Sequence, residues 1–262
     1  MVIKKIINRI KAEKAKSSYK AELAQVRDIL NKGERPIYHV HVRKTAGTSI
    51  NFAFLSNAEA TNTQEFYRSL ALKANQRKIK NNKVFVGWNV KLINQGDFSY
   101  AFSHTPFHQL NLPSQVRTFT CLRDPAKRVI SHYNMLRYFQ LNEVAHPCMK
   151  VEGKWLGNSF DDFLDRVPKE HLMNQLYMFS ESMNVEDALN NLRSLDKIIY
   201  TEQLDRGLLE LEEFTQWKLP VSNQKKYSHK EDITAEQLEK LKKLLAAEYQ
   251  LMELLAKEHL TS

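Results

Sequence analysis

The sequence predicts an α/β fold, in which helices cover both faces of a mostly parallel sheet. Two observations favour this class. Short apolar segments with period-two alternation are typical of strands, and each is followed by a turn or by a segment of helical period. The C-terminal half is rich in helical segments, and no linker or internal repeat divides the 262 residues, which include only 7 Gly and 7 Pro. Strands that alternate with helices predict a parallel sheet.

Residues 1–34 are expected to form an amphipathic helical extension, and residues 35–262 to form one domain. The helical pattern continues without Pro to about Leu30 and ends at "NKGERP". We favour a helix that packs on the domain, and the alternative is contact with a membrane surface or a partner through residues 1–16. Five apolar residues recur at helical spacing near its start: Val2, Ile3, Ile6, Ile7 and Ile10.

The elements of the domain follow in order. Strands are expected at "IYHVHV", "KVFVGW", "SYAFSH" and "VRTFTCL", and helices at "SINFAFLSNA" and "DPAKRVISHYNMLRYF", where Asp-Pro is a helix-start signal. The later part predicts helices at "SFDDFLDRV", "PKEHLMNQLYMF", "NVEDALNNLRSL" and "QLDRGLLELEEFTQW", with one strand at "DKIIYTE". A long last helix is expected from Thr234, where "TAEQ" fits a capping box.

Composition narrows the cellular setting and the class of partner. No apolar run approaches the ~20 residues of a membrane span, and Lys and Arg interrupt the N-terminus too often for a signal peptide, so we expect a cytoplasmic protein. Cys121 and Cys148 lack zinc or disulfide spacing. The net charge of +9 is concentrated in residues 1–34 and in the acid-free residues 66–96. Such tracts meet nucleic acid, anionic lipid or an acidic glycan, for which Trp88 offers a stacking surface, or they are solvated.

Two strand-to-helix junctions contain residues suited to bind phosphate. In "HVRKTAGTSI", the first-turn amides of a helix face an anion, Lys44 adds a mobile charge, and three hydroxyl residues add donors: Thr45, Thr48 and Ser49. This is no Walker A motif, because a second Gly is missing and the Lys precedes the loop. Taken alone, a capped helix beside a surface Lys is an equal interpretation. In "TCLRDPAKRVISHY", Arg123 and Ser131 can grip a second phosphate.

The two junctions together resemble the cofactor motifs of sulfotransferases that use 3′-phosphoadenosine 5′-phosphosulfate (PAPS). Lys44-Thr45-Ala46-Gly47-Thr48-Ser49 is similar to their 5′-phosphosulfate loop, "PKTAGTS" or "PKTGSTS". Arg123-Asp124-Pro125, followed by Arg128 and Ser131-His132-Tyr133, resembles their 3′-phosphate motif. The similarity is greatest to the carbohydrate branch, which includes the heparan sulfate 2-O enzymes, and it extends from Ile37 to about Ala256 with weaker similarity at "MNQLYM", "IIYTEQLDRGLLEL" and "NQKKYSHK". Arg43 departs from the Pro that is usual there.

The resemblance implies a P-loop-like sheet over residues 35–262 and a sulfotransferase. Such an enzyme transfers the sulfuryl group in line to an acceptor hydroxyl, here on a carbohydrate or glycoconjugate, and releases adenosine 3′,5′-bisphosphate (PAP) without a metal. Lys44 would neutralise the leaving oxygen, and Arg123 with Ser131 would hold the 3′-phosphate. The loop from Thr45 through Ala46, Gly47 and Thr48 to Ser49 would grip the 5′ end. Lys225 and Lys226 would contact the nucleotide, or form an exposed loop.

Histidine is the expected general base, because its pKa lies near neutrality. "YAFSHTPFHQL" is similar to the "GH.PF" segment that carries the family's base, so we assign this role to His104, with a structural hydrogen bond as the alternative. His108 is a weaker candidate, and His132 is expected to face the nucleotide or the core. His39 and His41 share a strand face and could ligate a metal, but no third ligand is spaced suggestively.

Two other classes of function stay open. A nucleotide-dependent kinase is disfavoured because no Walker A motif and no Walker B Asp can be assigned. A non-catalytic basic module would bind nucleic acid or an anionic surface with strong salt dependence. We expect no nucleic-acid partner, and neither the acceptor nor the oligomeric state can be derived from the sequence.

Overall fold

The computed structural model describes residues 19–31, 33–72, 77–220 and 231–261, together with Glu13 and Ser17. Lys225, Lys226 and nearly all of residues 1–16 lie outside the described residues, so the predictions for them stay predictions. Among the described residues, no helix has both the length and the apolar character that crossing a membrane requires.

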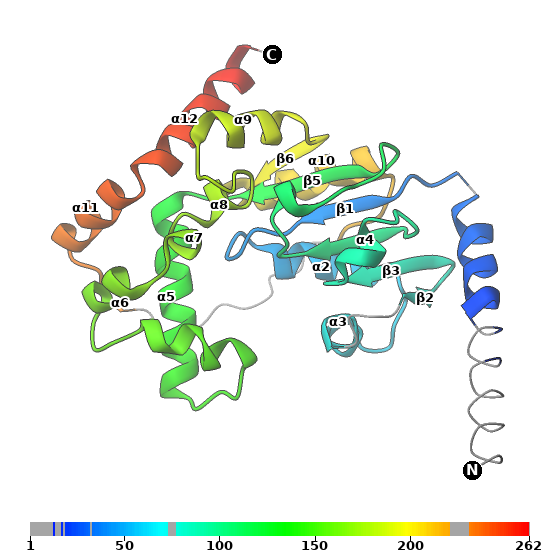
Figure 1. Cartoon of the computed structure of the whole chain (residues 1–262), viewed down its shortest axis with the longest axis horizontal. Helices are drawn as coiled ribbons and strands as arrows, with labels where there is room; N and C mark the ends of the chain where they lie inside the picture. The colour runs from blue at the N-terminus through cyan, green and yellow to red at the C-terminus, as the bar shows by residue number, and fades with distance from the viewer. Residues whose placement is uncertain are drawn as a thin grey trace.

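A six-stranded sheet forms the centre of the fold, in the order β2-β3-β4-β1-β5-β6 (Figure 1). All neighbouring pairs are parallel except β2 and β3, which form an antiparallel hairpin at one edge. The α/β class with a mostly parallel sheet is therefore confirmed. The strands are β1 (Ile37–Val40), β2 (Lys78–Lys80), β3 (Lys83–Gly87), β4 (Tyr100–Ser103), β5 (Arg117–Leu122) and β6 (Lys197–Tyr200).

Strand β1 lies between β4 and β5, and this position determines where a ligand can bind. After β1 the chain moves outward to β2 and β3, returns to β4, and then crosses to β5 and β6 on the other side. The connections that leave β1 and β5 therefore diverge. In open α/β sheets, the loops at such a divergence border a crevice at the carboxyl ends of the strands.

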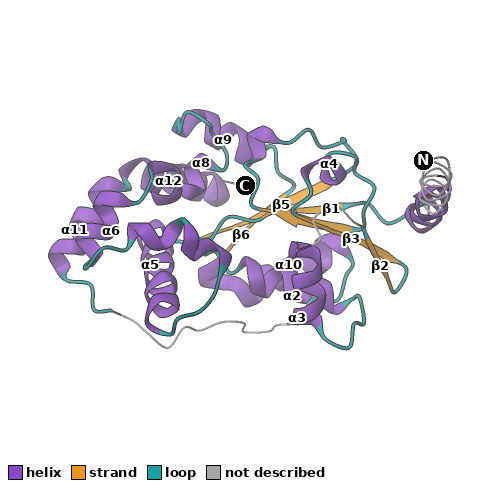
Figure 2. Cartoon of the chain, turned by 60° about the horizontal axis from the view of Figure 1, so that its bottom comes forward, coloured by secondary structure: helices purple, strands orange, loops and turns teal. Residues whose placement is uncertain are grey.

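Helices cover both faces of the sheet (Figure 2). Successive strand residues point to opposite faces, so in β1 Ile37 joins one core, whereas Tyr38 and Val40 join the other. The first core contains residues of α2 (Gly47–Ser56), α3 (Thr63–Leu72) and α10 (Leu204–Thr215). The second contains residues of α4 (Val90–Ile93), α8 (Asn174–Tyr177), α9 (Val185–Arg193) and α12 (Ala246–Thr261).

A third apolar cluster belongs to a helical group beside the sheet, on the side away from the N-terminal helix (Figure 1). Its long helix α5 begins three residues after β5, so the group borders the carboxyl ends of the strands. The cluster draws on α5 (Pro125–Leu141), α6 (Phe160–Arg166), α7 (Lys169–Leu172) and α11 (Ala235–Leu244), and on the short turns η2 (Pro147–Lys150) and η3 (Glu152–Trp155).

The N-terminal helix packs on the domain in the part that the structure describes. Residues 19–30 are helical, and Val26 and Ile29 are buried in the second core, with only 1% and 7% of their surfaces exposed. This agrees with the favoured interpretation of a packed helix. Contact with a membrane through residues 1–16 stays untested.

Several elements differ from the predictions. The "TAEQ" capping box is present, since the Thr234 hydroxyl accepts from the Gln237 amide at 3.2 Å, but the last helix is divided at Leu245 into α11 and α12. The segment "PKEHLMNQLYMF" forms two short helices, α7 and α8, instead of one. Helix α3 and strand β2 were not predicted. The β2–β3 turn uses Asn81 and Asn82 at positive φ, which is typical of a type I′ hairpin.

Candidate functional site

The loop from residue 41 to 46, between β1 and α2, has an unusual backbone conformation. Lys44 and Ala46 have φ angles of 68° and 61°, in the left-handed region that non-glycine residues rarely adopt. Ala46 is also the N-cap of α2, and its side chain provides no capping hydrogen bond. The first-turn amides of a helix have no acceptor within the helix, and the helix dipole adds positive potential there. In proteins generally, a helix start of this kind is a common place for an anion to bind.

Gly47 is required because His41 packs against the start of α2. A Cβ atom added to Gly47 would lie 1.9 Å from His41 Nε2, which is far inside van der Waals contact. His41 is 4% exposed and cannot be displaced into solvent without opening the core. The single Gly of the loop therefore serves a close approach between helix and imidazole.

The side chains of the loop have separate roles. The hydroxyl of Thr45 is buried and donates to the carbonyl of Val42 at 3.0 Å, so it stabilises the loop from within and its proton is not available to a ligand. Lys44 extends toward α5, where its Nζ lies 3.4 Å from Met135 Sδ. Thr48 is half-buried and Ser49 is buried. Of the predicted hydroxyl donors, Thr45 is thus largely structural.

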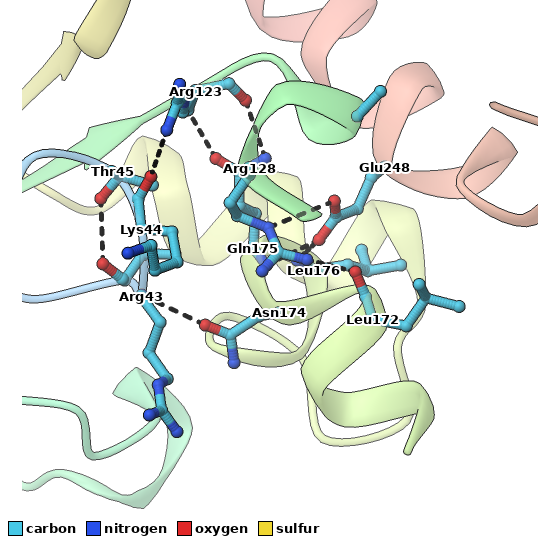
Figure 3. A network of polar contacts seen from close by, with 12 residues as sticks. Arg43, Lys44, Thr45, Arg123, Arg128, Leu172, Asn174, Gln175, Leu176 and Glu248 are labelled. Atoms are coloured by element: carbon cyan, nitrogen blue, oxygen red, sulfur yellow. Dashed lines mark hydrogen bonds and ion pairs between the residues drawn. The ribbon is translucent and has the colours of Figure 1, made fainter. Parts of the chain in front are cut away.

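The junction between β5 and α5 has a conventional helix start. Asp124 is the N-cap, and its Oδ1 accepts from the Lys127 amide at 2.8 Å, while Pro125 occupies the first turn. Arg123 precedes this cap and is half-buried. Its Nη1 donates to the Lys44 carbonyl at 3.1 Å, which joins the two predicted phosphate motifs (Figure 3). Its Nε is buried without a hydrogen-bond partner among the described residues, and Ser131 is half-buried two turns further along α5.

His104 follows β4 and has the tautomer that a general base needs. Its Nδ1 donates to the His41 carbonyl at 2.6 Å. Because a carbonyl can only accept, Nδ1 holds the proton and the lone pair lies on Nε2. Burial, and then the positive charge of Arg43, lowers the pKa of His104 to about 4, so the imidazole is neutral at pH 7. Trp88 flanks it, with ring centroids 5.9 Å apart.

His39, in β1, and His41, directly after it, lie on the same side with their rings stacked 5.1 Å apart, as expected, but they belong to a buried polar network. Asn51 Oδ1 lies 2.9 Å from His39 Nδ1 and accepts the Tyr100 hydroxyl at 2.7 Å, while Asn51 Nδ2 lies 3.4 Å from His41 Nδ1. Burial lowers the pKa of His39 to about 3 and that of His41 well below its usual value. In the described part of the chain, no group of three or more His, Cys, Asp or Glu side chains could hold a metal.

The side chain of Arg43 is only partly exposed, and its guanidinium binds a residue of η3. Its Nη2 forms an ion pair with Glu152 Oε1 at 2.6 Å, and the other oxygen of Glu152 accepts from His132 Nε2 at 2.8 Å. Burial alone would raise the pKa of Glu152, but the hydrogen bond from His132 and the charge of Arg43 lower it to about 2. Burial lowers the pKa of His132 to about 4. His132 thus faces the core, and Arg43 ties the loop to η3.

The remaining candidates lie apart from this centre. His108 Nε2 donates to the Tyr177 carbonyl at 3.2 Å and borders an open cavity of about 630 Å³ beside α9. In the basic tract of residues 66–96, two cations have structural partners. Arg77 Nη2 donates to Gln95 at 2.6 Å, and Lys83 pairs with Glu34 at 2.9 Å. The tract is therefore not a single free cationic surface.

Two residues of the site were not predicted from the sequence. Gln175 bonds the backbone of Arg123 from 52 positions away, and Glu152 reaches Arg43 from a short turn between α5 and α6. A polar residue at the start of a weakly similar segment, "MNQLYM", was the one indication of the first, and none existed for the second.

The carboxyl ends of three neighbouring strands thus converge. The loop after β1 brings Lys44, the end of β4 brings His104, and the end of β5 brings Arg123. Two hydrogen bonds to carbonyls of the β1 loop hold the other two side chains against it. In comparisons with known proteins, no protein-family model matches this chain, and no curated protein is significantly similar to it in sequence.

Proposed function

We propose that the protein is a sulfotransferase that moves the sulfuryl group of PAPS to a hydroxyl of an acceptor, on a carbohydrate or glycoconjugate. One observation carries the proposal. The three predicted elements, an anion-binding loop, a guanidinium and a neutral imidazole, meet at the ends of β1, β5 and β4 through the bonds Arg123–Lys44 and His104–His41. The resemblance of the two motifs to PAPS-binding motifs supports it, as does a strand order with a divergence at β1 and β5.

The donor set fits a nucleotide with phosphates at both the 5′ and 3′ positions. The uncapped start of α2 offers backbone amides and the Lys44 ammonium to a 5′-phosphosulfate. Arg123 offers a 3′-phosphate its guanidinium, whose Nε is buried without a partner among the described residues. Ser131, eight residues later in the same sequence motif, offers a hydroxyl. The proposal therefore includes a P-loop-like role for the β1 loop without a Walker A sequence.

The chain's own residues would act by positioning and charge stabilisation. When bound, PAPS supplies a sulfur–oxygen bond whose cleavage yields PAP. His104 Nε2 would accept the proton of the acceptor hydroxyl as that oxygen attacks sulfur in line. Lys44 Nζ would stabilise the negative charge that develops on the leaving oxygen, and the fixed loop amides would do so without reorganisation. These contributions need only groups that the loops already hold in place.

The surroundings of His104 suit a sugar. Trp88, at the end of β3, has its ring against Phe102 at 4.7 Å between centroids and near His104 at 5.9 Å. It is half-buried, so an aromatic surface lies beside the proposed base. Binding sites commonly combine such apolar surfaces with a few fixed polar groups. This favours a ring-shaped acceptor over a small alcohol.

Nucleotide binding is the first test. The thermal midpoint is followed with PAP, with ATP and Mg²⁺, and with duplex DNA, because a ligand that binds the native state raises it by mass action. We expect PAP to stabilise the protein and Arg123→Ala to remove that effect. Arg206→Ala, at an exposed Arg paired with Glu210 on α10, is the control and should keep it. A shift with ATP alone would indicate the kinase, one with DNA alone the basic module, and no shift with PAP would refute the proposal.

The general base is tested separately. His104→Ala should lower sulfuryl transfer by roughly 10²–10⁴-fold, the usual contribution of general-base catalysis, with PAP affinity preserved. His108→Ala is the matched control, since His108 bonds the Tyr177 carbonyl instead of the His41 carbonyl, and it should retain activity. Full activity in His104→Ala would show that another group takes the proton.

A further inference from the structure

Two consecutive residues at the start of α8 bridge the two proposed phosphate-binding loops. Asn174 Oδ1 accepts from the Arg43 amide at 3.3 Å, next to Lys44. Gln175 bonds the backbone of Arg123 on the other side (Figure 3). Both side chains are buried, with 6% and 1% of their surfaces exposed. These two adjacent residues, called here the Asn174–Gln175 step, therefore form hydrogen bonds with both loops.

The contact of Gln175 with Arg123 is two-pronged. Its Oε1 accepts from the Arg123 amide at 2.7 Å, and its Nε2 donates to the Arg123 carbonyl at 2.9 Å. The two bonds satisfy both backbone groups of one residue, so they restrain the position and the orientation of its peptide. The backbone of Arg123 is therefore held in place, and its guanidinium extends from there to the Lys44 carbonyl.

Glu248, on the C-terminal helix α12, anchors this step from behind. Its Oε1 accepts from the amides of Gln175 at 2.6 Å and Leu176 at 3.2 Å. Its Oε2 lies 4.0 Å from Nε of Arg128, and Arg128 also donates to the His171 carbonyl at 3.1 Å and to the Leu172 carbonyl. Both charged side chains are fully buried. A buried ion pair adds little net stability for its desolvation cost, which makes a role in holding one geometry the better explanation.

We propose that the Asn174–Gln175 step sets the spacing between the 5′- and 3′-phosphate sites and so determines selectivity for a 3′,5′-bisphosphorylated nucleotide. This inference rests on the proposed function. A ligand that contacts two sites gains affinity from the second site only when the spacing matches without reorganisation. Gln175 is accordingly a positioning residue for Arg123, and Asn174 is one for the Lys44 loop.

The test compares dissociation constants for PAP and for adenosine 5′-phosphate, measured by calorimetry on the full chain. Gln175→Met keeps the shape but loses both bonds, so PAP affinity should fall at least about tenfold, the equivalent of one net hydrogen bond, while affinity for the monophosphate changes less than about threefold. Asn174→Leu loosens the 5′ loop, so both ligands should weaken by similar factors. The selectivity ratio, which is the dissociation constant for the monophosphate divided by that for PAP, therefore falls in the first variant and not in the second.

Asn191→Leu is the matched control, since it removes an amide that donates to the Phe179 carbonyl at 2.7 Å on α9, away from both loops. It should leave the ratio unchanged. Where Gln175→Met does not fold, Gln175→Glu replaces it, because the carboxylate retains the acceptor for the Arg123 amide and loses the donor. An unchanged ratio in a folded Gln175 variant, whether Gln175→Met or Gln175→Glu, overturns the inference. A wild-type protein without preference for PAP instead overturns the proposed function, so the two failures are distinct.

Discussion

The two strand-to-helix junctions of the site differ in whether the N-cap side chain binds an amide of the helix that follows. After β1, the N-cap is Ala46, whose side chain makes no capping bond to α2, and two non-glycine residues take left-handed φ angles. After β5, Asp124 caps the Lys127 amide at 2.8 Å and Pro125 begins a regular α5. At the first junction the N-cap side chain binds no helix amide, whereas at the second junction it binds one.

Under the proposed function, the two junctions would bind their two anions by different means. In the proposed function, the backbone of the β1 junction would be the ligand-binding group, so binding would depend on conformation and on the small Gly47. At the β5 junction the amides belong to the cap, and the Arg123 side chain would do the binding. A left-handed non-glycine residue costs roughly 1–2 kcal/mol, and such strain concentrates at functional sites. Substitutions at the β1 junction should therefore lower PAP affinity, because they move the backbone. Loss of the cap at the β5 junction should lower stability and leave PAP affinity nearly unchanged.

Acid should give the largest effect, because histidines both at the β1 junction and on α5 are buried and neutral. The pKa of His39 is about 3 and that of His132, on α5, about 4, against about 6.5 in an unfolded chain. As the pH falls from 6.5 toward 4, these histidines bind protons in the unfolded chain but not in the folded chain, so the free energy of unfolding decreases. The slope is about 1.4 kcal/mol per pH unit for each histidine.

Urea unfolding between pH 5 and 7 measures this slope. His39→Gln and His132→Gln should each reduce it by about one proton, whatever they do to stability at pH 7. A second such group, His41, directly follows β1, and its pKa also lies well below its usual value, so a slope should remain in both variants. A slope that neither substitution changes would contradict buried neutral imidazoles at these positions.

Gly47→Ala tests the β1 junction directly. The added Cβ would lie 1.9 Å from His41 Nε2, and His41 is held between the rings of His39 and His104 at centroid distances of 5.1 and 4.2 Å. The start of α2 must then shift, with a cost of roughly 1–3 kcal/mol from overpacking. We expect PAP affinity to fall by about 100-fold, because the anion-binding amides move with it.

The control for Gly47→Ala is Gly207→Ala on α10. There the added Cβ would crowd Ile199 Cβ at 3.0 Å, away from the site. Two contributions to stability oppose each other here, the crowding at Ile199 and the preference of a helix for Ala over Gly by about 1 kcal/mol, but PAP affinity should stay as in the wild type. Equal loss of affinity in both variants would mean that general destabilisation, and not the β1 junction, explains the effect.

Arg43→Gln should change the acid limb of activity. Arg43 is the second cause, after burial, of the low pKa of His104, and the Glu152 carboxylate opposes it. Without the guanidinium the pKa of His104 rises, so the unprotonated base is lost at a higher pH and the acid limb of kcat/KM moves upward. The shift should be modest, because burial is the larger cause. Proton NMR of His104 gives the same information without activity, and Arg206→Gln should leave it unchanged.

The fold followed from the sequence where a local pattern was sufficient. Period two marked β3, β4 and β5, and the Asp-Pro signal placed the start of α5 at Pro125. Helix α3 was missed although Phe66 and Leu70, which pack on the sheet, stand four positions apart as in a helix. Strand β2 was missed because its three residues hold one apolar side chain, Ile79, between two Lys. Hydrophobic period is a poor guide where cations fill the exposed face.

The site was predictable only as far as its motifs. Lys44, Arg123 and His104 stand at strand ends, a position that sequence order alone indicates. Gln175 and Glu152 act through contacts across the fold, with partners 52 and more than 100 positions away, and no spacing rule links such pairs. The left-handed φ of Ala46 was equally hidden, because Ala has no preference for that region.

Asp124→Ala should have the smallest effect on binding and isolates the β5 junction. Loss of the N-cap bond to Lys127 should cost about 1 kcal/mol of stability, as for Ser159→Ala, where Ser159 caps the Asp162 amide of α6 at 3.1 Å. PAP affinity should change less than about threefold in both, since Asp124 serves the helix and Arg123 the ligand. A tenfold loss confined to Asp124→Ala would place the α5 amides in the binding site, and the two junctions would then work alike.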